Sequence, residues 1–94
     1  MKRVLVPLAP GFEELEAVTI IDLLRRAQID VTVAGLEKGP ITGSRGTRIV
    51  PDTLLSSAVN SDYDMLVLPG GLPGADNLNS DDHIHDLLQQ MSVK

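Results

Sequence analysis

Three glutamates stand close together near the N-terminus, where a strand gives way to a helix. The stretch PLAPGFEELEAVTIIDLL, residues 7–24, places Glu13, Glu14 and Glu16 after a Pro-Gly loop and at the head of an apolar helical segment. Carboxylates in the first turn of a helix complement the positive end of its dipole. A carboxyl group that faces an apolar interior instead has a raised pKa, and a neutral carboxylic acid can donate a proton at pH 7. The residues alone leave both interpretations open.

The spacing of the apolar residues distinguishes Glu16 from its two neighbours. One predicted helix face carries Glu16 together with four apolar side chains, at Ile20, Leu23, Leu24 and Ala27. Glu16 therefore lies on the same predicted face as core residues, whereas Glu13 lies in the first turn and can reach solvent. On pattern alone the solvated interpretation is still favoured, because glutamate is almost never buried without a partner.

A second candidate is the glycine pair in VLPGGLPG, residues 67–74. Ligands of open α/β sheets bind beyond the carboxyl ends of the strands, and Gly70 and Gly71 follow a predicted strand directly. A glycine lets the backbone approach a ligand, and its N–H group can stabilise an oxyanion. The alternative is a tight turn. The spacing is not the dinucleotide fingerprint, and no helix is expected to open at once.

Two further candidates carry weaker signals. Arg45 stands at the tip of a predicted hairpin, where a lone arginine is usually solvated. His83 and His85 are two positions apart and do not share a helix face, so we expect no metal site there.

The elements that must position these residues follow from hydrophobic patterning. Residues 4–8 form a continuous apolar run, residues 13–27 a helix, and residues 29–34 a β-branched strand. A strand, a helix and a strand within about 35 residues indicate a βαβ unit with parallel strands. The fold class is therefore α/β.

The remainder continues this pattern with one interruption. Residues 41–42 and 47–50 predict a hairpin around GSRG, and residues 64–68 predict another buried strand. Ser80 is a candidate N-cap for a helix whose apolar stripe is Ile84, Leu87, Leu88 and Met91. Two helices of useful length cannot cover both faces of a doubly wound sheet, so we expect residues 1–94 to be the N-terminal part of one larger domain.

Composition narrows the classes of function. The 94 residues carry a net charge of −5 with scattered basic residues, which argues against nucleic acid as the partner. The chain has no cysteine, which excludes a disulfide, a thiolate metal site and a cysteine nucleophile within it. No apolar run approaches a signal peptide or a membrane span, so a cytoplasmic location and no membrane partner are expected. No metal or organic cofactor is indicated.

Two motifs together resemble a known family. APGFEELEAVTIIDLLRRAQIDVTVAG followed by VLPGGLPGADNL is similar to the DJ-1/PfpI superfamily, also called ThiJ/PfpI, over residues 2–88. The resemblance implies a flavodoxin-like sandwich of the class I glutamine-amidotransferase type, incomplete in this chain. It implies that Glu16 is the functional glutamate, that the Gly71 amide with Gly70 beside it forms the oxyanion pocket, and that Arg45 lies at the pocket rim or a dimer interface.

The same resemblance indicates that the nucleophile of the family is not within these 94 residues. Family members carry a nucleophilic cysteine in an elbow after the next strand, and no residue here matches it. We expect that part to come from further residues of the same protein or from a C-terminal fragment supplied as a partner. The complete protein would then be a cysteine-dependent glyoxalase or deglycase for small reactive carbonyls, with a stress-response role, and a homodimer or oligomer. The alternative is a non-catalytic domain on this fold, such as a chaperone or the sensor half of a transcriptional regulator.

Overall fold

The central strand and its parallel neighbour come from the two apolar runs near the N-terminus. The structure, a computed structural model, describes residues 2–70, 74–79, 81, 84 and 86. Strand β1 (Arg3–Leu8) pairs in parallel with β2 (Asp30–Gly35), and helix α1 (Glu14–Arg26) connects them. The predicted βαβ unit is confirmed, and its boundaries differ from the prediction by at most one residue.

Two short strands complete a four-stranded sheet in the order β5-β2-β1-β6, with all neighbours parallel. Strand β6 (Met65–Leu66) lies beside β1 and is shorter than the predicted strand at 64–68, although the Val67 N–H still donates to the Leu5 carbonyl. Strand β5 (Thr53–Leu54) lies beside β2. The sequence pattern does not predict β5, because two residues are too few to show an alternation.

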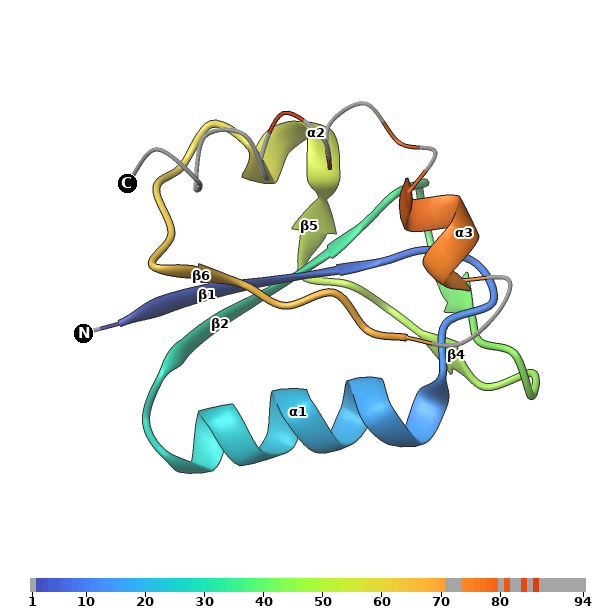
Figure 1. The fold of residues 1–94 in the computed structure, drawn as a ribbon, viewed down its shortest axis with the longest axis horizontal. Coiled ribbons are helices and arrows are strands. Elements are labelled where there is room, and N and C mark those ends of the chain that lie inside the picture. Colours follow the sequence, from blue (N-terminus) through green and yellow to red (C-terminus); the bar gives the residue numbers. More distant parts are fainter. Residues whose placement is uncertain (1, 71–73, 80, 82–83, 85, 87–94) are drawn as a thin grey trace.

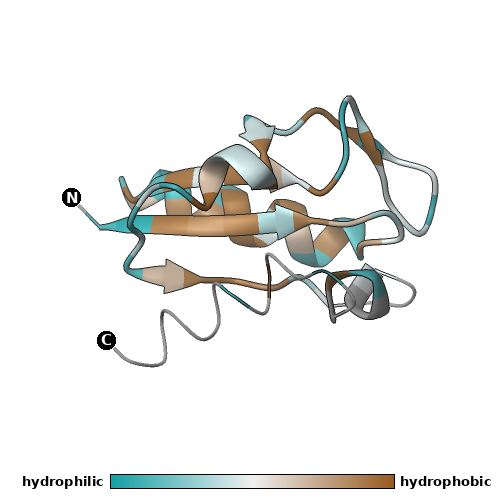
Figure 2. Ribbon diagram, turned by 90° about the horizontal axis from the view of Figure 1, so that it is seen from above, coloured by the Kyte–Doolittle hydropathy of each residue, from teal (hydrophilic) through white to brown (hydrophobic). Residues whose placement is uncertain are grey.

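Helices lie on both faces of this sheet. Figure 1 shows α1 along one face and α2 (Leu55–Ala58) on the other. The core on the α1 side contains Val4, Val6, Leu8, Phe12, Ala17, Val31, Val33 and Ile41. The core on the opposite side contains Leu5, Ala9, Ala34, Leu55, Ala58, Tyr63, Leu78 and Ile84. Strand β1, hydrophobic along most of its length in Figure 2, therefore contributes to both cores, as expected for a strand buried on both faces.

The face of α1 that packs on the sheet differs from the predicted one. Ala17 is fully buried, and Ile21 and Leu24 pack behind it at i+4 and i+7. Glu16 is exposed, and Leu23 keeps 59 % of its surface accessible. The prediction that Glu16 faces the apolar core is therefore wrong. Leu24 belongs to both possible stripes, so the spacing of apolar residues could not separate them.

The predicted hairpin is confirmed. Strands β3 (Ile41–Thr42) and β4 (Arg48–Ile49) are antiparallel, and the loop between them passes through Gly46, whose φ is 93°. Glycine adopts a positive φ readily because it has no Cβ. The hairpin lies at the end of the sheet from which α1 begins (Figure 1).

A short helix follows the glycine-rich loop. Helix α3 (Gly74–Asn79) is joined to the loop before α1, because the Gly74 N–H donates to the Gly11 carbonyl at 3.1 Å. The expectation that no helix opens directly after these glycines is therefore wrong. Six residues are too few for helical periodicity to reveal the element in the sequence.

The predicted helix after Ser80 is described only in part. Ile84 and Asp86 are helical, and the Asp81 carboxylate accepts a hydrogen bond from the Ile84 N–H at 3.2 Å, as an N-cap residue does. The other predicted positions lie outside the described residues: Ser80, His83, His85, Leu87, Leu88 and Met91. Within the ranges that the structure describes, no helix is both long enough and apolar enough to span a bilayer.

Candidate functional site

The glutamates at the start of α1 have three different partners. Glu13 is the N-cap residue, with an extended backbone, and its Oε2 accepts a hydrogen bond from the Glu16 N–H at 2.7 Å. The first N–H groups of a helix have no partner within the helix, and a side-chain oxygen at the N-cap satisfies one of them. Glu13 therefore has a local structural role.

Glu14 binds the loop of the hairpin. Its Oε2 accepts hydrogen bonds from the backbone N–H groups of Arg45 at 2.8 Å and Thr47 at 3.2 Å, and its Oε1 accepts one from the Ser44 hydroxyl at 3.1 Å. Desolvation, the largest single contribution, raises the pKa of Glu14. The hydrogen bonds from its own backbone, from the loop amides and from Ser44 together outweigh it and hold the pKa below the ordinary value of 4.5.

Glu16 binds the glycine-rich loop on the other side of the helix start. Its Oε1 accepts a hydrogen bond from the Gly70 N–H at 2.9 Å. The Gly70 carbonyl in turn accepts one from the Glu13 N–H at 3.1 Å. The first turn of α1 therefore binds both polar groups of Gly70, and the loop after β6 is fixed against Glu16.

Two glycines allow this close approach. A Cβ at Gly70 would lie 3.2 Å from the Oε2 of Glu16, which is tighter than ordinary contact. A Cβ at Gly74 would lie 2.6 Å from the Phe12 Cα, so a side chain there would collide with backbone. Glycine at these positions lets two loops approach the helix start closely, as expected at a ligand site.

The site lies at the carboxyl end of the central strands. Figure 1 shows the loop after β1, the hairpin and α3 gathered at this end. Hydrogen bonds join them: the Ser44 N–H donates to the Phe12 carbonyl at 2.8 Å, and the Asn77 side chain donates to the Pro10 carbonyl at 2.7 Å. Open α/β sheets bind ligands outside the carboxyl ends of their strands, so the location suits a binding or catalytic site.

The predicted site residues are placed as follows. Glu16 and Gly70 are in direct contact, although 54 positions separate them in the sequence. Arg45 lies on the hairpin loop with an exposed side chain, and its backbone N–H binds Glu14. Gly71 lies outside the described residues. The Gly70 N–H, a candidate donor to an oxyanion, already donates to Glu16.

The sequence pattern does not predict the contact between Glu14 and the hairpin loop. An acid in the first turn of a helix is expected to interact with solvent and the helix dipole, yet the oxygens of Glu14 bind three groups of the hairpin loop. A Cβ at Gly43 would lie 2.6 Å from the Cδ of Glu14, so this glycine makes room for the carboxylate. The signal in the sequence is Gly43, the first residue of GSRG, and a glycine there does not indicate which acid is bound beside it.

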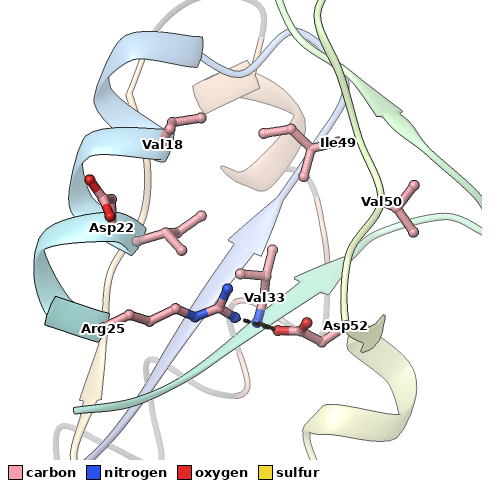
Figure 3. A pocket seen from close by; sticks show the side chains of 8 residues that line it. Val18, Asp22, Arg25, Val33, Ile49, Val50 and Asp52 are labelled. Atoms are coloured by element: carbon pink, nitrogen blue, oxygen red, sulfur yellow. Dashed lines mark hydrogen bonds and ion pairs between the residues drawn. The ribbon is translucent and has the colours of Figure 1, made fainter. Parts of the chain in front are cut away.

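A separate apolar groove of about 410 Å³ lies between α1 and the segment that follows β4 (Figure 3). Its walls include Val18, Ile49 and Val50. At one end the Asp52 carboxylate accepts hydrogen bonds from Arg25 at 3.0 Å and from the Val33 N–H at 2.8 Å. The groove contains neither Glu16 nor Gly70, so it is distinct from the candidate site.

Comparison with known proteins agrees with this geometry. The sequence model of the DJ-1/PfpI family matches residues 2–94. The chain belongs to the DJ-1/PfpI family. It is 46 % identical over 89 residues to the protein dj-1beta of Drosophila melanogaster, a match that covers 94 % of this chain and 48 % of that protein. It is 36 % identical over 89 residues to the glutathione-independent glyoxalase DJR-1.2 of Caenorhabditis elegans, covering 94 % of this chain and 47 % of that protein.

Solved structures show the same fold. The oxidized DJ-1 of Toxoplasma gondii superposes with a TM-score of 0.96 at 39 % identity, covering 99 % of this chain and 51 % of that one. The flavodoxin-like α/β fold predicted from the sequence is thereby confirmed. The chain spans about half the length of these DJ-1/PfpI relatives.

Proposed function

We propose that residues 1–94 form the N-terminal half of a DJ-1/PfpI domain in a full-length protein whose remaining segment carries a nucleophilic cysteine. The full-length protein would be a glyoxalase or deglycase that acts on small reactive carbonyls without a metal or organic cofactor. The observation that supports this function best is the contact between the Glu16 carboxylate and the Gly70 N–H. It places an acid beside a glycine-rich loop at the carboxyl end of the sheet.

The proposed chemistry begins with addition of the cysteine thiolate to the substrate carbonyl. A C–S bond forms, and the carbonyl π pair moves to oxygen, where the amide of Gly71 would stabilise the negative charge. Glu16 would then transfer a proton to that oxygen. Among the described residues, the Gly70 N–H is the donor to the Glu16 carboxylate, at Oε1, so Oε2 would be the oxygen that exchanges the proton. The relative named a glutathione-independent glyoxalase supports this substrate class.

The test is turnover of methylglyoxal by the purified full-length protein without added glutathione. We expect steady turnover that a thiol-blocking reagent abolishes. Residues 1–94 alone should show none, because the chain contains no cysteine. The absence of turnover by the full-length protein across a panel of small 2-oxoaldehydes would contradict the proposal and favour the non-catalytic alternative. Turnover by residues 1–94, shown by mass spectrometry to be free of longer protein, would contradict the cysteine mechanism.

We also propose that the full-length protein is a cytoplasmic homodimer, with the groove of Figure 3 at the subunit interface. Val50 is 75 % exposed and Val18 48 % exposed beside it, an apolar surface of the kind that associating proteins bury. Sedimentation equilibrium of the full-length protein should give a dimer that Val50→Asp weakens. Leu23→Asp, at an exposed α1 residue outside the groove lining, is the matched control. A monomer in the unmodified protein would refute this assembly.

A further inference from the structure

Among the residues that the structure describes, the carboxylate of Glu14 accepts more hydrogen bonds than either neighbouring glutamate, and all of the donors belong to one loop. Two backbone N–H groups and one hydroxyl from residues 44–47 donate to it. Hydrogen bonds to an ionised acceptor are roughly twice as strong as neutral ones. Two backbone hydrogen bonds also tie the hairpin to the segment before α1: the Ser44 N–H donates to the Phe12 carbonyl and the Gly11 N–H to the Thr42 carbonyl, both at 2.8 Å.

The packing around Glu14 also indicates that its carboxylate is held against the hairpin. Gly43 lies against its side chain so closely that a Cβ would be 2.6–2.7 Å from three atoms of the carboxyl end. The backbone at Gly43 is outside the left-handed region, so local conformation does not require glycine there. The absence of a side chain at this position instead makes space for the Glu14 carboxylate.

The loop held by Glu14 adjoins the candidate site. Glu14 and Glu16 are two residues apart in one helical turn, which rises about 5.4 Å. Glu14 binds the hairpin loop on one side of this turn, and Glu16 binds Gly70 on the other. The hairpin loop also carries Arg45, the one cationic side chain that the sequence reading assigned to the site.

We propose that Glu14 is a positioning residue, which holds the hairpin loop as a wall of the substrate pocket and thereby fixes where Arg45 stands. This inference rests on the proposed function of the full-length protein. It requires an acceptor oxygen at residue 14, and the negative charge of the carboxylate strengthens the hydrogen bonds that it accepts. The amide oxygen of a glutamine could accept from both backbone N–H groups, and its amide nitrogen could donate to the Ser44 hydroxyl.

The first experiment measures the loop without using activity. Hydrogen exchange in the full-length protein should show that Glu14→Ala speeds exchange of the Arg45 and Thr47 amides by about tenfold or more, and that Glu14→Gln stays within about threefold of the unmodified protein. Gly43→Ala keeps the glutamate but displaces its carboxylate, so it should reproduce the effect of Glu14→Ala. Glu37→Ala, at an exposed glutamate, is the control. Unchanged exchange in both Glu14→Ala and Gly43→Ala would overturn the anchor.

The second experiment connects the loop to the site. We expect Glu14→Ala to raise KM for methylglyoxal by about three- to tenfold with a smaller change in kcat, since binding is perturbed more than chemistry, and Glu14→Gln to restore KM. Faster loop exchange with KM and kcat both unchanged would overturn the positioning role. If the unmodified protein turned over no carbonyl, the proposed function would fail and the pocket-wall role with it. The exchange data would still decide whether Glu14 holds the loop.

Discussion

The two sides of the first turn of α1 use the same side chain in different ways. On the hairpin side, both oxygens of Glu14 are occupied by three donors. On the glycine side, Glu16 receives one hydrogen bond from the described residues, at Oε1. A carboxylate whose acceptor positions are filled acts as an anchor. A carboxylate with an oxygen left over can take part in chemistry, so the number of bonds separates Glu14 from Glu16. Glu13 also accepts a single bond, and its partner distinguishes it: the donor is the Glu16 N–H of the same helix rather than the glycine-rich loop.

The largest expected effect concerns the close contact between Gly74, at the start of α3, and Phe12, in the loop before α1. Gly74→Ala would place a methyl group 2.6 Å from the Phe12 Cα, and backbone cannot move aside as a flexible side chain can. We expect a loss of about 2–3 kcal/mol or more in the free energy of unfolding, measured by urea denaturation of the full-length protein. Gly39→Ala is the control, because Gly39 has a φ of 78° but open space around its Cβ position. A loss at Gly74 no larger than the loss at Gly39 would contradict this prediction, because a steric collision with backbone should cost more than a positive φ in open space.

A smaller effect tests the glycine side alone. Gly70→Ala would place its Cβ 3.2 Å from Oε2 of Glu16, so the carboxylate must shift by a few tenths of an ångström. The backbone at Gly70 lies outside the left-handed region, which leaves the fold itself little affected. We expect kcat for methylglyoxal to fall by about tenfold with the melting temperature nearly unchanged, because small misplacements of a reacting group are costly. An unaltered kcat would indicate that the position of Glu16 is not critical.

The smallest effect is a pH dependence confined to the hairpin side. The folded pKa of Glu14 is lowered, so its contribution to stability is complete above the ordinary value of 4.5 and is lost as the pH falls through the folded pKa. Below pH 4.5 the Arg45 and Thr47 amide signals should shift together in NMR titrations of the full-length protein. The Leu36 amide, which donates to the Leu8 carbonyl, should not follow them. Arg45 and Thr47 signals that titrate at or above pH 4.5 would argue against the carboxylate anchor.

Much of the fold could be predicted because long elements repeat a pattern. Strands β1 and β2 and helix α1 are each at least six residues long, and hydrophobic periodicity identifies such elements. Strand β5 and helix α3 could not be predicted in this way, because their stability comes from partners distant in sequence. Helix α3, for example, depends on the loop at Gly11.

The sequence could indicate which residues belong to the candidate site, but not all of the hydrogen bonds that they make. The resemblance to the DJ-1/PfpI family singled out Glu16 and Gly70, which the structure brings together. The argument that led to Glu16 from helical spacing was wrong, because the buried face of α1 runs through Ala17. The partners of Glu14 could not be foreseen, since a hairpin about thirty residues away supplies them.

The central claim is that Glu16 performs chemistry while Glu14 and Glu13 perform structural work. The most direct test is kcat for methylglyoxal in the full-length protein carrying Glu16→Gln, Glu14→Gln or Glu13→Gln. Glutamine keeps an acceptor oxygen for each observed hydrogen bond but cannot transfer a proton. The account predicts that Glu16→Gln lowers kcat by about 100-fold or more, and that the other two variants stay within about threefold of the unmodified protein. Similar kcat values for all three variants would contradict it.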